Sequence, residues 1–228
     1  MKPLEILYQD EHLIAINKPH GLLVHRSKIA TNTEVYALQV LRDQIGQKVY
    51  PVHRLDRKTS GVLLFALSSE NNALLQNQFA ENRVEKVYLS IVRGFTEKEK
   101  EIDYALTNDS GKTQNAITHL HTLKQSEIPV PHGKFSTSRY SLIEVHPKTG
   151  RFHQIRKHMA HIFHPIIGDR PHGCNKQNKL FKEKWNMMTM LLHAESLQFT
   201  HPISNEPMVI KANWSEEFER SLQFLELK

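Results

Sequence analysis

The chain has 228 residues, of which 39% are hydrophobic and 24% charged, a composition that fits a folded globular protein and excludes a disordered or fibrous chain. Its 30 Lys and Arg side chains outnumber 24 Asp and Glu side chains, giving a formal net charge of +6. This excess is compatible with a polyanionic partner but does not establish one.

The chain carries one cysteine and no obvious targeting segment. Cys174 cannot form an intrachain disulfide, which favours a reducing compartment. Charged residues interrupt the apolar residues of the first 18 positions, so no signal-peptide core is present there. No stretch approaches the roughly 20 apolar residues of a membrane helix. We therefore expect a cytoplasmic protein with no membrane partner.

The first predicted elements are a hairpin and a helix. Residues 4–8 and 13–17 are short β-prone runs separated by a polar turn, which predicts a β-hairpin. Apolar residues then repeat at helical spacing up to a glycine, which predicts a helix over residues 32–45 with Asn32 or Thr33 as its cap.

The central stretch reads VHRLDRKTSG and is followed by the apolar run VLLFAL at residues 62–67. Such a short, uninterrupted run predicts a strand buried on both faces. In an extended lead-in, Arg54 and Asp56 share one face, because successive side chains alternate. Cations beside a carboxylate favour its ionised form, although a purely structural charge network at a strand end explains these residues equally well.

A helix and a strand are predicted after the central stretch. Serine caps and helical spacing predict a helix over residues 68–82, with Leu74, Leu75 and Phe79 on its apolar face. Residues 86–94 alternate and predict a strand that ends in a glycine turn. By composition alone, Tyr88 is an ordinary strand aromatic.

The second chemically informative region follows the turn at residues 147–150. Apolar positions at helical spacing, Phe163 among the last of them, predict a helix that displays the basic residues Arg151, Arg156 and Lys157 around its start. Further on, residues 170–178 are predicted to be a polar loop. Ser215 is predicted to cap a final helix.

Four segments resemble motifs of the RluA-type pseudouridine synthases. HRLDRKTSGVLLFAL resembles the catalytic motif of this family, KVYLSIVRG the segment whose tyrosine contacts the target base, and PKTGRFHQIRKH the motif TGRxHQxRxH. NKPHGLLVHRS resembles the first family motif. Within it VHRS, together with the HG…N pattern after Gly168, resembles the synthase C branch, which acts on tRNA.

This resemblance implies an RNA pseudouridine synthase, an isomerase that needs no cofactor and no metal. It implies that Asp56 is the essential carboxylate, acting either as a nucleophile or as a base towards the ribose, that Tyr88 packs on the uracil, and that Arg156 pairs with Asp56. Such a pairing lowers the pKa of a carboxyl group by roughly 1–3 units. The branch implies position 65 of tRNA as the target, and ribosomal RNA remains the alternative within the family.

RNA contacts are predicted from charge and geometry. A uridine inside a stem must flip into the pocket, at a cost of a few kcal/mol, and Arg54 is positioned to fill the gap that it leaves. Phosphate contacts can offset this cost. The candidates for them, each also explicable as a solvated surface charge, are Arg26, Lys148, Arg151, Lys157, Arg170, Lys176 and Lys179.

Three other functions compete with this one. His153, His158, His161 and His164 invite a metallohydrolase, but no HExxH motif accompanies them. A noncatalytic RNA-binding module would not need Asp56, Tyr88 and Arg156 together. A glycoside hydrolase would need a second paired carboxylate.

The resemblance runs from Leu4 to about Ala212 and implies the fold. We expect an α+β fold, with a mixed, largely antiparallel central sheet flanked by helices and a cleft across its middle. We expect residues 1–228 to form a single catalytic domain without an N-terminal S4-like RNA-binding domain, and to act as a monomer on tRNA or another structured RNA.

Overall fold

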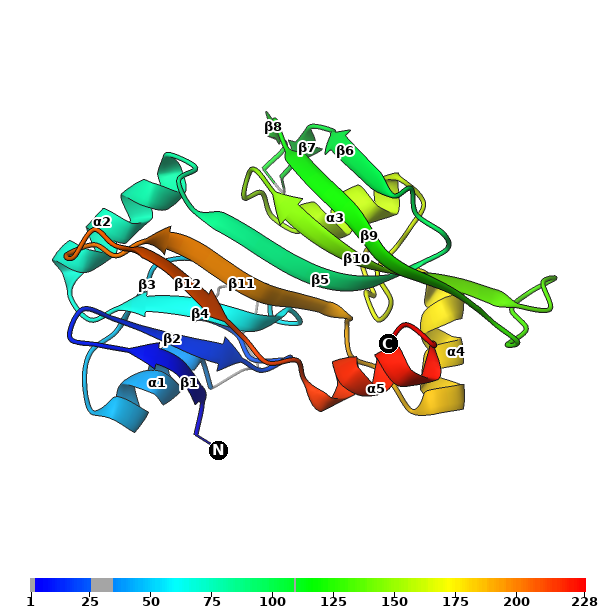
Figure 1. The fold of residues 1–228 in the computed structure, drawn as a ribbon, viewed down its shortest axis with the longest axis horizontal. Coiled ribbons are helices and arrows are strands. Elements are labelled where there is room, and N and C mark those ends of the chain that lie inside the picture. The colour runs from blue at the N-terminus through cyan, green and yellow to red at the C-terminus, as the bar shows by residue number, and fades with distance from the viewer. Residues whose placement is uncertain (1–2, 26–34, 109) are drawn as a thin grey trace. The chain divides into compact units, whose positions relative to one another are not determined.

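The computed structural model describes residues 3–25, 35–108 and 110–228 (Figure 1). The chain divides into two compact units. Unit 1 comprises Met1–Lys86 and Ala194–Asn213, and unit 2 comprises Val87–His193 and Trp214–Lys228.

The strands of unit 1 surround the predicted core strand. Strand β4 (Ser60–Ala66) is buried at all seven positions, which confirms the prediction of a strand covered on both faces. It pairs antiparallel with β2 (Leu13–Lys18), which forms the predicted hairpin with β1 (Glu5–Gln9). The short β3 (Tyr50–Pro51) also pairs with β4. A second hairpin joins β11 (Leu192–Thr200) and β12 (Pro207–Lys211).

Helix α1 (Ala37–Ile45) starts later than the sequence predicts. Its N-cap is Tyr36, and the predicted caps Asn32 and Thr33 lie outside the described residues. The backbone N–H groups of Ala37 and Leu38 donate to carbonyl oxygens of residues 23 and 24. Because these bonds satisfy the first N–H groups, the helix needs no capping side chain.

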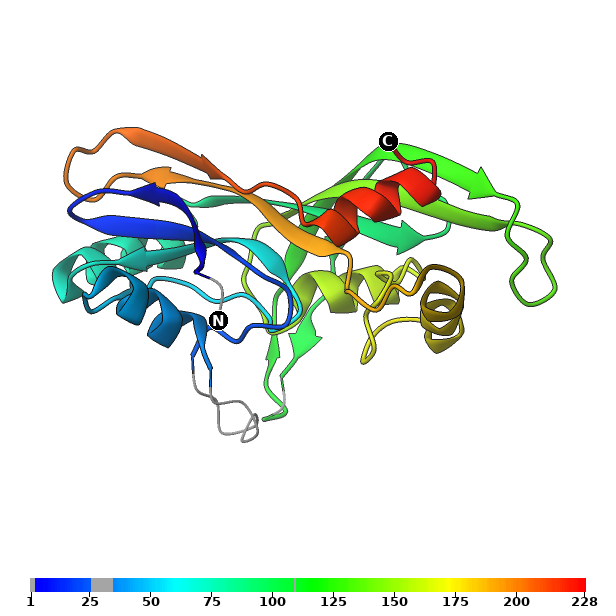
Figure 2. The same ribbon diagram turned by 90° about the horizontal axis from the view of Figure 1, so that it is seen from below.

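Helix α2 (Ser69–Ala80) begins as predicted, with Ser68 Oγ accepting from the backbone N–H of Asn71 at 3.1 Å. Its buried face contains Leu75, whereas Leu74 is 45% exposed, so the prediction for Leu74 was wrong. On the same face, the positions one turn before and one turn after Leu75 carry the buried amide side chains of Asn71 and Gln78 instead of apolar residues. In Figure 2, α1 and α2 lie on the same side of the strands of unit 1.

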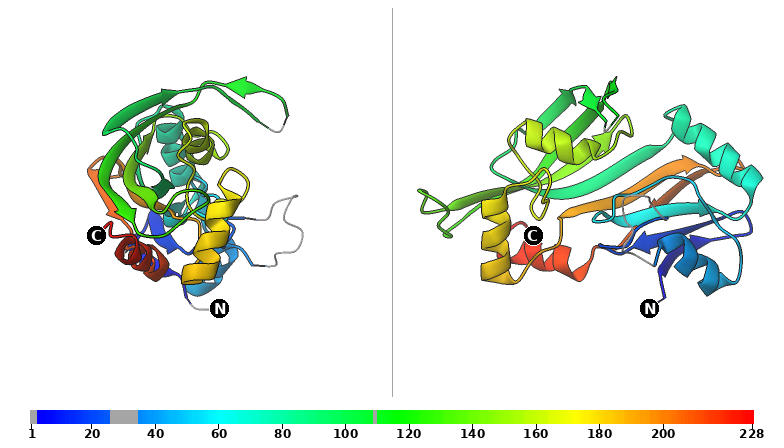
Figure 3. Two further views of the ribbon diagram at one scale, coloured as in Figure 1. Left: turned by 90° about the vertical axis from the view of Figure 1, so that its right-hand side faces the viewer. Right: turned by 180° about the vertical axis from the view of Figure 1, so that it is seen from behind.

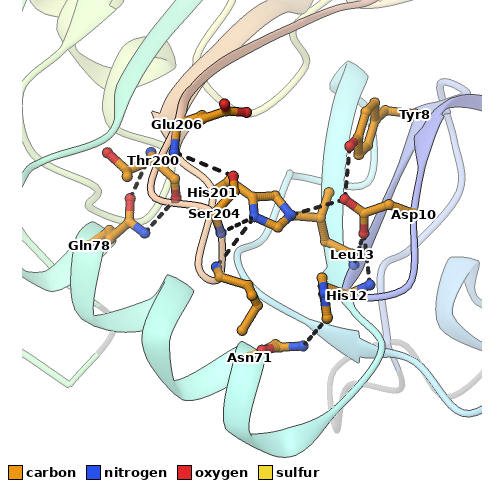
Figure 4. A network of polar contacts seen from close by, with 11 residues as sticks. Tyr8, Asp10, His12, Leu13, Asn71, Gln78, Thr200, His201, Ser204 and Glu206 are labelled. Carbon is orange, nitrogen blue, oxygen red and sulfur yellow. Dashed lines mark hydrogen bonds and ion pairs between the residues drawn. The ribbon is translucent and has the colours of Figure 1, made fainter.

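A polar network ties the two hairpin turns of unit 1 together (Figure 4). His201 Nε2 lies 2.9 Å from Asp10 Oδ2, and its Nδ1 accepts from the backbone N–H of Ser204 at 3.0 Å. Asp10 also accepts from Tyr8 and from the backbone N–H groups of residues 12 and 13. Although burial opposes it, these bonds lower the pKa of Asp10. The network is fully explained as a structural link between the turns.

The sheet of unit 2 runs in the order β5-β10-β9-β6. Strands β5 (Glu85–Arg93), β10 (Ser138–Pro147), β9 (Ile117–Ile128) and β6 (Glu99–Asp103) pair antiparallel, and β7 (Leu106–Thr107) pairs with β8 (Thr113–Gln114). Alternation along β5 and β10 sends side chains into two separate cores. One core contains Ile91, Tyr140 and Phe218, and the other contains Val92, Ile143 and Met159.

Each core of unit 2 is closed by helices. Helix α3 (Gln154–His161) lies along the face of β10 (Figure 3), while α4 (Asn175–Trp185) and α5 (Glu216–Phe224) contribute to the other core. Ser215 caps α5 as predicted. Phe163 lies beyond the end of α3 and is 88% exposed, so its predicted place on the apolar face was wrong.

Helix α4 overturns the prediction of a polar loop over residues 170–178. The helix starts at Asn175 and ends at Trp185. Only Gln177 and Phe181 are buried, and the segment has neither a capping side chain nor a sustained apolar stripe. The docking of Phe181 into the core of unit 2, and not a local signal, therefore stabilises this helix.

Strands that pair antiparallel, with helices α1–α5 beside them, confirm the α+β class. No helix in the described ranges is long and apolar enough to cross a membrane.

Candidate active site

Asp56 lies in unit 1, in the tight turn that leads into β4. The backbone N–H of Thr59 donates to the Asp56 carbonyl oxygen at 3.1 Å, which closes a turn over residues 56–59. Asp56 is half-buried and Arg54 exposed, whereas Leu55 between them is buried. The turn holds the carboxylate at the mouth of the core strand, and the predicted common face of Arg54 and Asp56 stays a prediction.

Gly61 allows the chain to enter the sheet directly after this turn. Its φ is +109°, and a Cβ atom at this position would lie 2.1 Å from the carbonyl oxygen of Ala194. No side chain fits such a close approach of two backbones, and few residues other than glycine adopt this φ. The position of the Asp56 turn above β4 therefore depends on this glycine.

Lys18 is a buried cation beside Asp56. Its side chain is 0% exposed, and Nζ donates to the carbonyl oxygens of Pro19 at 3.0 Å, Leu22 at 2.8 Å and Arg57 at 3.2 Å. Burial lowers the pKa of Lys18 to about 7, while the charge of Asp56 raises it. Three carbonyl acceptors match the three N–H groups of an ammonium ion, and they favour the charged form as well.

The loop that follows Lys18 is bound to the Asp56 turn through Arg57. The backbone N–H of Gly21 donates to the Arg57 carbonyl oxygen at 2.8 Å, and Arg57 Nε donates to the Gly21 carbonyl oxygen at 2.9 Å. Burial and the nearby cations Lys18, Lys58 and Arg57 lower the pKa of His20, in the same loop, to about 4. The surroundings of Asp56 in unit 1 are thus rigid and positively charged.

His53, the first residue of the HRLD motif, has a structural role. Its Nε2 accepts from the backbone N–H of Leu64 at 3.1 Å, and its ring stacks on Phe79 with 5.0 Å between centroids. Burial lowers the pKa of His53 to about 4. A neutral imidazole that accepts from β4 fixes the start of the motif, and catalysis is not needed to explain it.

Tyr88 lies in unit 2, on β5, opposite Val145 of β10. It is half-buried and packs against the core that includes Ile155 and Met159 of helix α3. Tyr88 and the helix that carries Arg156 therefore share one face of the sheet of unit 2. The structure brings these two predicted site residues to one side of unit 2.

Arg156 forms a buried ion pair with Asp169, which the sequence analysis does not identify. Arg156 Nε donates to Asp169 Oδ2 at 2.8 Å, and a terminal nitrogen donates to Oδ1 at 2.8 Å. The two residues are 4% and 1% exposed. A bidentate pair fixes the plane of the guanidinium. The predicted pairing of Arg156 with Asp56 stays a prediction.

Gln154 and His158 explain most of the remaining motif TGRFHQIRKH. Gln154 Nε2 donates to the carbonyl oxygen of Ile117 at 3.0 Å, and its Oε1 accepts from Thr149 Oγ1 at 2.7 Å. The nitrogens of His158 lie 2.9 Å from Thr118 Oγ1 and 3.0 Å from the Tyr104 carbonyl oxygen. Both side chains are buried and bonded, so they fix α3 on the sheet and thereby position Arg156.

His153 and His172 form a second contact between the motif and the loop that carries Asp169. His153 Nδ1 lies 2.9 Å from His172 Nε2, and Phe152 stacks on the His153 ring at 3.8 Å. His153 has a φ of +56°, which is uncommon for a residue other than glycine. A strained residue at a helix start that is held by its neighbours often marks a functional site.

The predicted RNA contacts fall into three groups. Arg54 is exposed in unit 1, and Lys148, Arg170 and Lys176 are exposed in unit 2. Others have local partners: Arg151 Nε donates to the Asn115 carbonyl oxygen, Lys157 Nζ to that of Thr107, and Lys179 lies 3.7 Å from Glu183. Arg26 lies outside the described residues. All these contacts stay predictions.

The histidines that suggested a metallohydrolase have other partners. His158 is bonded as above, His161 stacks on Tyr104 at 3.7 Å, and His164 Nδ1 lies 2.9 Å from the Arg93 carbonyl oxygen. Over residues 3–25, 35–108 and 110–228, no group of three His, Cys, Asp or Glu side chains has the arrangement of a metal site.

Lys18 and Asp169 are the site residues that the sequence analysis missed. Lys18 stands at the end of a strand, where a lysine usually reaches solvent, and only its place in the NKP string hinted at a role. Asp169 lies 13 residues from its partner, so no helical or strand spacing connects them. Both are fixed by contacts made in the folded chain.

The fold and these motifs define an RNA-modifying isomerase, and comparison with known proteins agrees. Residues 12–161 match the family described as RNA pseudouridylate synthase, and the chain belongs to this family. It is 49% identical to the tRNA pseudouridine synthase C of Vibrio parahaemolyticus over 95% of this chain and 94% of the relative. It is 47% identical to that of Vibrio cholerae over 95% and 93% of the two chains.

Two solved structures share the fold. Human RNA pseudouridylate synthase domain containing 4 superposes with a TM-score of 0.76 at 23% identity, covering 97% of this chain and 93% of that one. Human RNA pseudouridylate synthase domain containing 1 gives a TM-score of 0.74 at 22% identity, covering 100% and 98%. At these identities the likeness concerns the fold, and it confirms the expected pseudouridine synthase architecture.

Proposed function

We propose that this protein converts one uridine of tRNA to pseudouridine, in the cytoplasm and without a cofactor. The observation that carries the proposal is the Asp56 turn, held over the buried Lys18, in a chain that closely resembles tRNA pseudouridine synthases along nearly its whole length. The target implied by this resemblance is position 65 of tRNA.

The reaction breaks the bond between N1 of the base and C1′ of the ribose, turns the base, and joins C5 to C1′. The proton on C5 leaves, and N1 gains one, so atoms and electrons balance without a redox group. Asp56 is the carboxylate that acts on the ribose, as a nucleophile or as a base. A carboxylate, and not a carboxylic acid, is needed for either role.

The roles of the residues in unit 2 follow from their chemistry. Arg156, oriented by Asp169, donates to an anionic acceptor, for which we propose Asp56. Tyr88 packs on the uracil and assists removal of the C5 proton. Arg54, exposed on unit 1, takes the place of the flipped nucleotide in its helix.

The test uses tRNA transcribed with tritium at C5 of uridine, because pseudouridine formation releases that hydrogen to water. Wild-type protein should release tritium in proportion to one site per tRNA. Asp56→Asn should retain less than about 0.1% of the wild-type rate, since it removes the reacting carboxylate, and should bind tRNA normally.

Asp43→Asn is the matched control, because it makes the same change in an exposed carboxylate and should leave the rate unchanged. An Asp56→Asn protein that is still active would overturn the assigned role. Wild-type protein that binds tRNA without releasing tritium would indicate a noncatalytic module. Pseudouridine missing only from ribosomal RNA in a strain without this protein would redirect the proposal to that substrate.

A further inference from the structure

Asp169, which orients Arg156, lies in the loop of residues 162–174 that joins α3 to α4. A residue in a loop keeps a fixed position only when other groups hold its backbone, because loops lack the repeated hydrogen bonds of helices and strands. The two bonds from Arg156 to the carboxylate, both 2.8 Å long, require such a position. The groups that hold the Asp169 backbone therefore decide where the Arg156 guanidinium lies.

The first part of this loop is held by strand β5. The backbone N–H of Ile167 donates to the Ile91 carbonyl oxygen at 3.0 Å, and Ile166 pairs with Val92 in an isolated antiparallel bridge. The backbone N–H of Asp169 reaches the Ile166 carbonyl oxygen only at 3.3 Å. The strand thus fixes residues 166 and 167, and the next two residues need another support.

Asn178 of helix α4 supplies that support through its side chain. Its Oδ1 accepts from the backbone N–H of Gly168 at 2.9 Å, and its Nδ2 donates to the Asp169 carbonyl oxygen at 2.6 Å. A side-chain amide offers an acceptor and a donor in one plane. The two bonds therefore hold Gly168 and Asp169 on both sides of the peptide bond that joins them.

Gly173 brings the start of α4 close to Asp169. A Cβ atom at Gly173 would lie 1.9 Å from the Asp169 carbonyl oxygen, so no other residue fits there without a shift of the backbone. The loop therefore returns onto its own Asp169 just before the helix begins. This return places Asp169 within reach of the short Asn178 side chain.

Helix α4 gives Asn178 a fixed base. Phe181 of this helix is 0% exposed in the core of unit 2, and the buried Gln177 accepts from the Tyr140 hydroxyl at 2.9 Å. Asparagine is a weaker helix former than alanine or lysine, so helix propensity does not explain Asn178. Its two side-chain bonds to the Asp169 loop do.

We propose that Asn178 is a positioning residue of the reaction, which sets the plane of the Arg156 guanidinium by holding the backbone of Asp169. The inference rests on the proposed function, in which Arg156 donates to the reacting carboxylate. It adds to that function a residue that acts through two others, and it gives helix α4 a part in the chemistry.

The first test is Asn178→Ala, measured as kcat and KM for tritium release from tRNA. Alanine removes both bonds and favours the helix, so α4 should stay folded. The kcat should fall by roughly 10-fold or more, because a shift of about 1 Å in a group that takes part in catalysis can cost about 100-fold. The KM should change by less than about 2-fold, since the lost interaction belongs to the chemical step.

Asn175→Ala is the matched control, because it makes the same change at an exposed position of the same helix and should alter neither constant. Urea denaturation of each variant gives its folded fraction, to which kcat is referred. A purely structural role predicts a lower urea midpoint with the kcat of wild type, and this result would overturn the inference.

Asn178→Asp tests the bond to Asp169 by itself. The change keeps the shape of the side chain and the acceptor for the Gly168 N–H, but it turns an oxygen towards the Asp169 carbonyl oxygen in place of the donor. The kcat should fall at least as far as in Asn178→Ala. An aspartate variant with the kcat of wild type would show that this bond does not position Arg156.

A double-mutant cycle tests whether Asn178 acts through Arg156. Arg156→Lys keeps a cation for Asp169 but removes the planar guanidinium. In that background Asn178→Ala should lower kcat by less than about 2-fold, because changes that act through one group are not additive. The same loss in both backgrounds would mean that Asn178 acts by another route and would contradict the proposal.

Two further outcomes separate this inference from the proposed function. A raised KM with unchanged kcat in Asn178→Ala would assign α4 to RNA binding, which overturns the positioning role and leaves the proposed function intact. Wild-type protein that releases no tritium would overturn the proposed function, and this inference with it.

Discussion

Lys18 of unit 1 and Arg156 of unit 2 are both buried cations, but their partners differ in kind. Lys18 donates to three neutral carbonyl oxygens, and Arg156 donates to both oxygens of the Asp169 carboxylate. Carbonyl groups solvate a charge without cancelling it, whereas a carboxylate cancels it. When Lys18 is protonated, its charge therefore acts on Asp56, while Arg156 contributes chiefly a fixed direction for its N–H groups.

The groups that support the two cations also differ. The loops around Lys18 are joined through backbone groups and Arg57, so the backbone itself forms the site. Around Arg156 the buried side chains of Gln154 and His158 form the support. Substitutions should therefore damage the support of Arg156 more readily than that of Lys18.

The largest effect is expected for Asp169→Asn. This change leaves the Arg156 guanidinium buried without its counter-charge, which typically destabilises a protein by about 3–5 kcal/mol. Urea denaturation measures the difference. Asp43→Asn, in an exposed pair, should cost less than about 1 kcal/mol. Equal effects for the two variants would show that the Arg156 pair contributes no more than a surface contact.

Lys18→Met tests the buried cation of unit 1 by the pH dependence of the stability. A lysine has a pKa near 10.4 in an unfolded chain and Lys18 one of about 7 in the folded protein, so between these values the unfolded chain binds the extra proton. Stability should then rise with pH from 7 towards 10, by up to about 1.4 kcal/mol per pH unit.

The methionine variant lacks this titration and should lose that rise. Thermal unfolding at several pH values measures it, and Lys179→Met, an exposed lysine, is the control. Parallel curves for wild type and Lys18→Met would mean that Lys18 stays charged throughout, held by its carbonyl partners and Asp56.

A smaller loss is expected for Gln154→Leu. It removes the amide that holds the start of α3 to β9 and leaves buried partners without bonds, at a cost of about 1–3 kcal/mol. Because α3 carries Arg156, the rate of tritium release should fall as well. Normal activity together with reduced stability would separate the support of the fold from the positioning of Arg156.

The smallest effect is expected for Arg57→Ala. The side chain is exposed and donates one bond to the Gly21 carbonyl oxygen, while the backbone bond from the Gly21 N–H to the Arg57 carbonyl oxygen remains. Stability should change by less than about 1 kcal/mol. A loss as large as that of Gln154→Leu would show that the loops around Lys18 depend on side chains after all.

Sequence patterns predicted the elements whose signals are local. The hairpin at residues 4–18, the buried strand before Leu67, the Ser68 cap and the Ser215 cap all follow from alternation, apolar runs or capping chemistry, and all are confirmed. The motifs likewise indicated the family correctly. Asp56, Tyr88 and Arg156 were chosen by resemblance, and their joint role stays a prediction.

What the sequence by itself determined is therefore the set of elements and motifs, because periodicity and capping depend on residues a few positions apart. Only the tertiary structure decided that Asp169 holds Arg156, that Lys18 is buried beside Asp56, and that a polar segment forms helix α4. These features depend on partners that are distant in sequence, or on backbone carbonyl groups, which every residue carries and which no sequence pattern can therefore indicate. Such contacts become strong only when folding buries them.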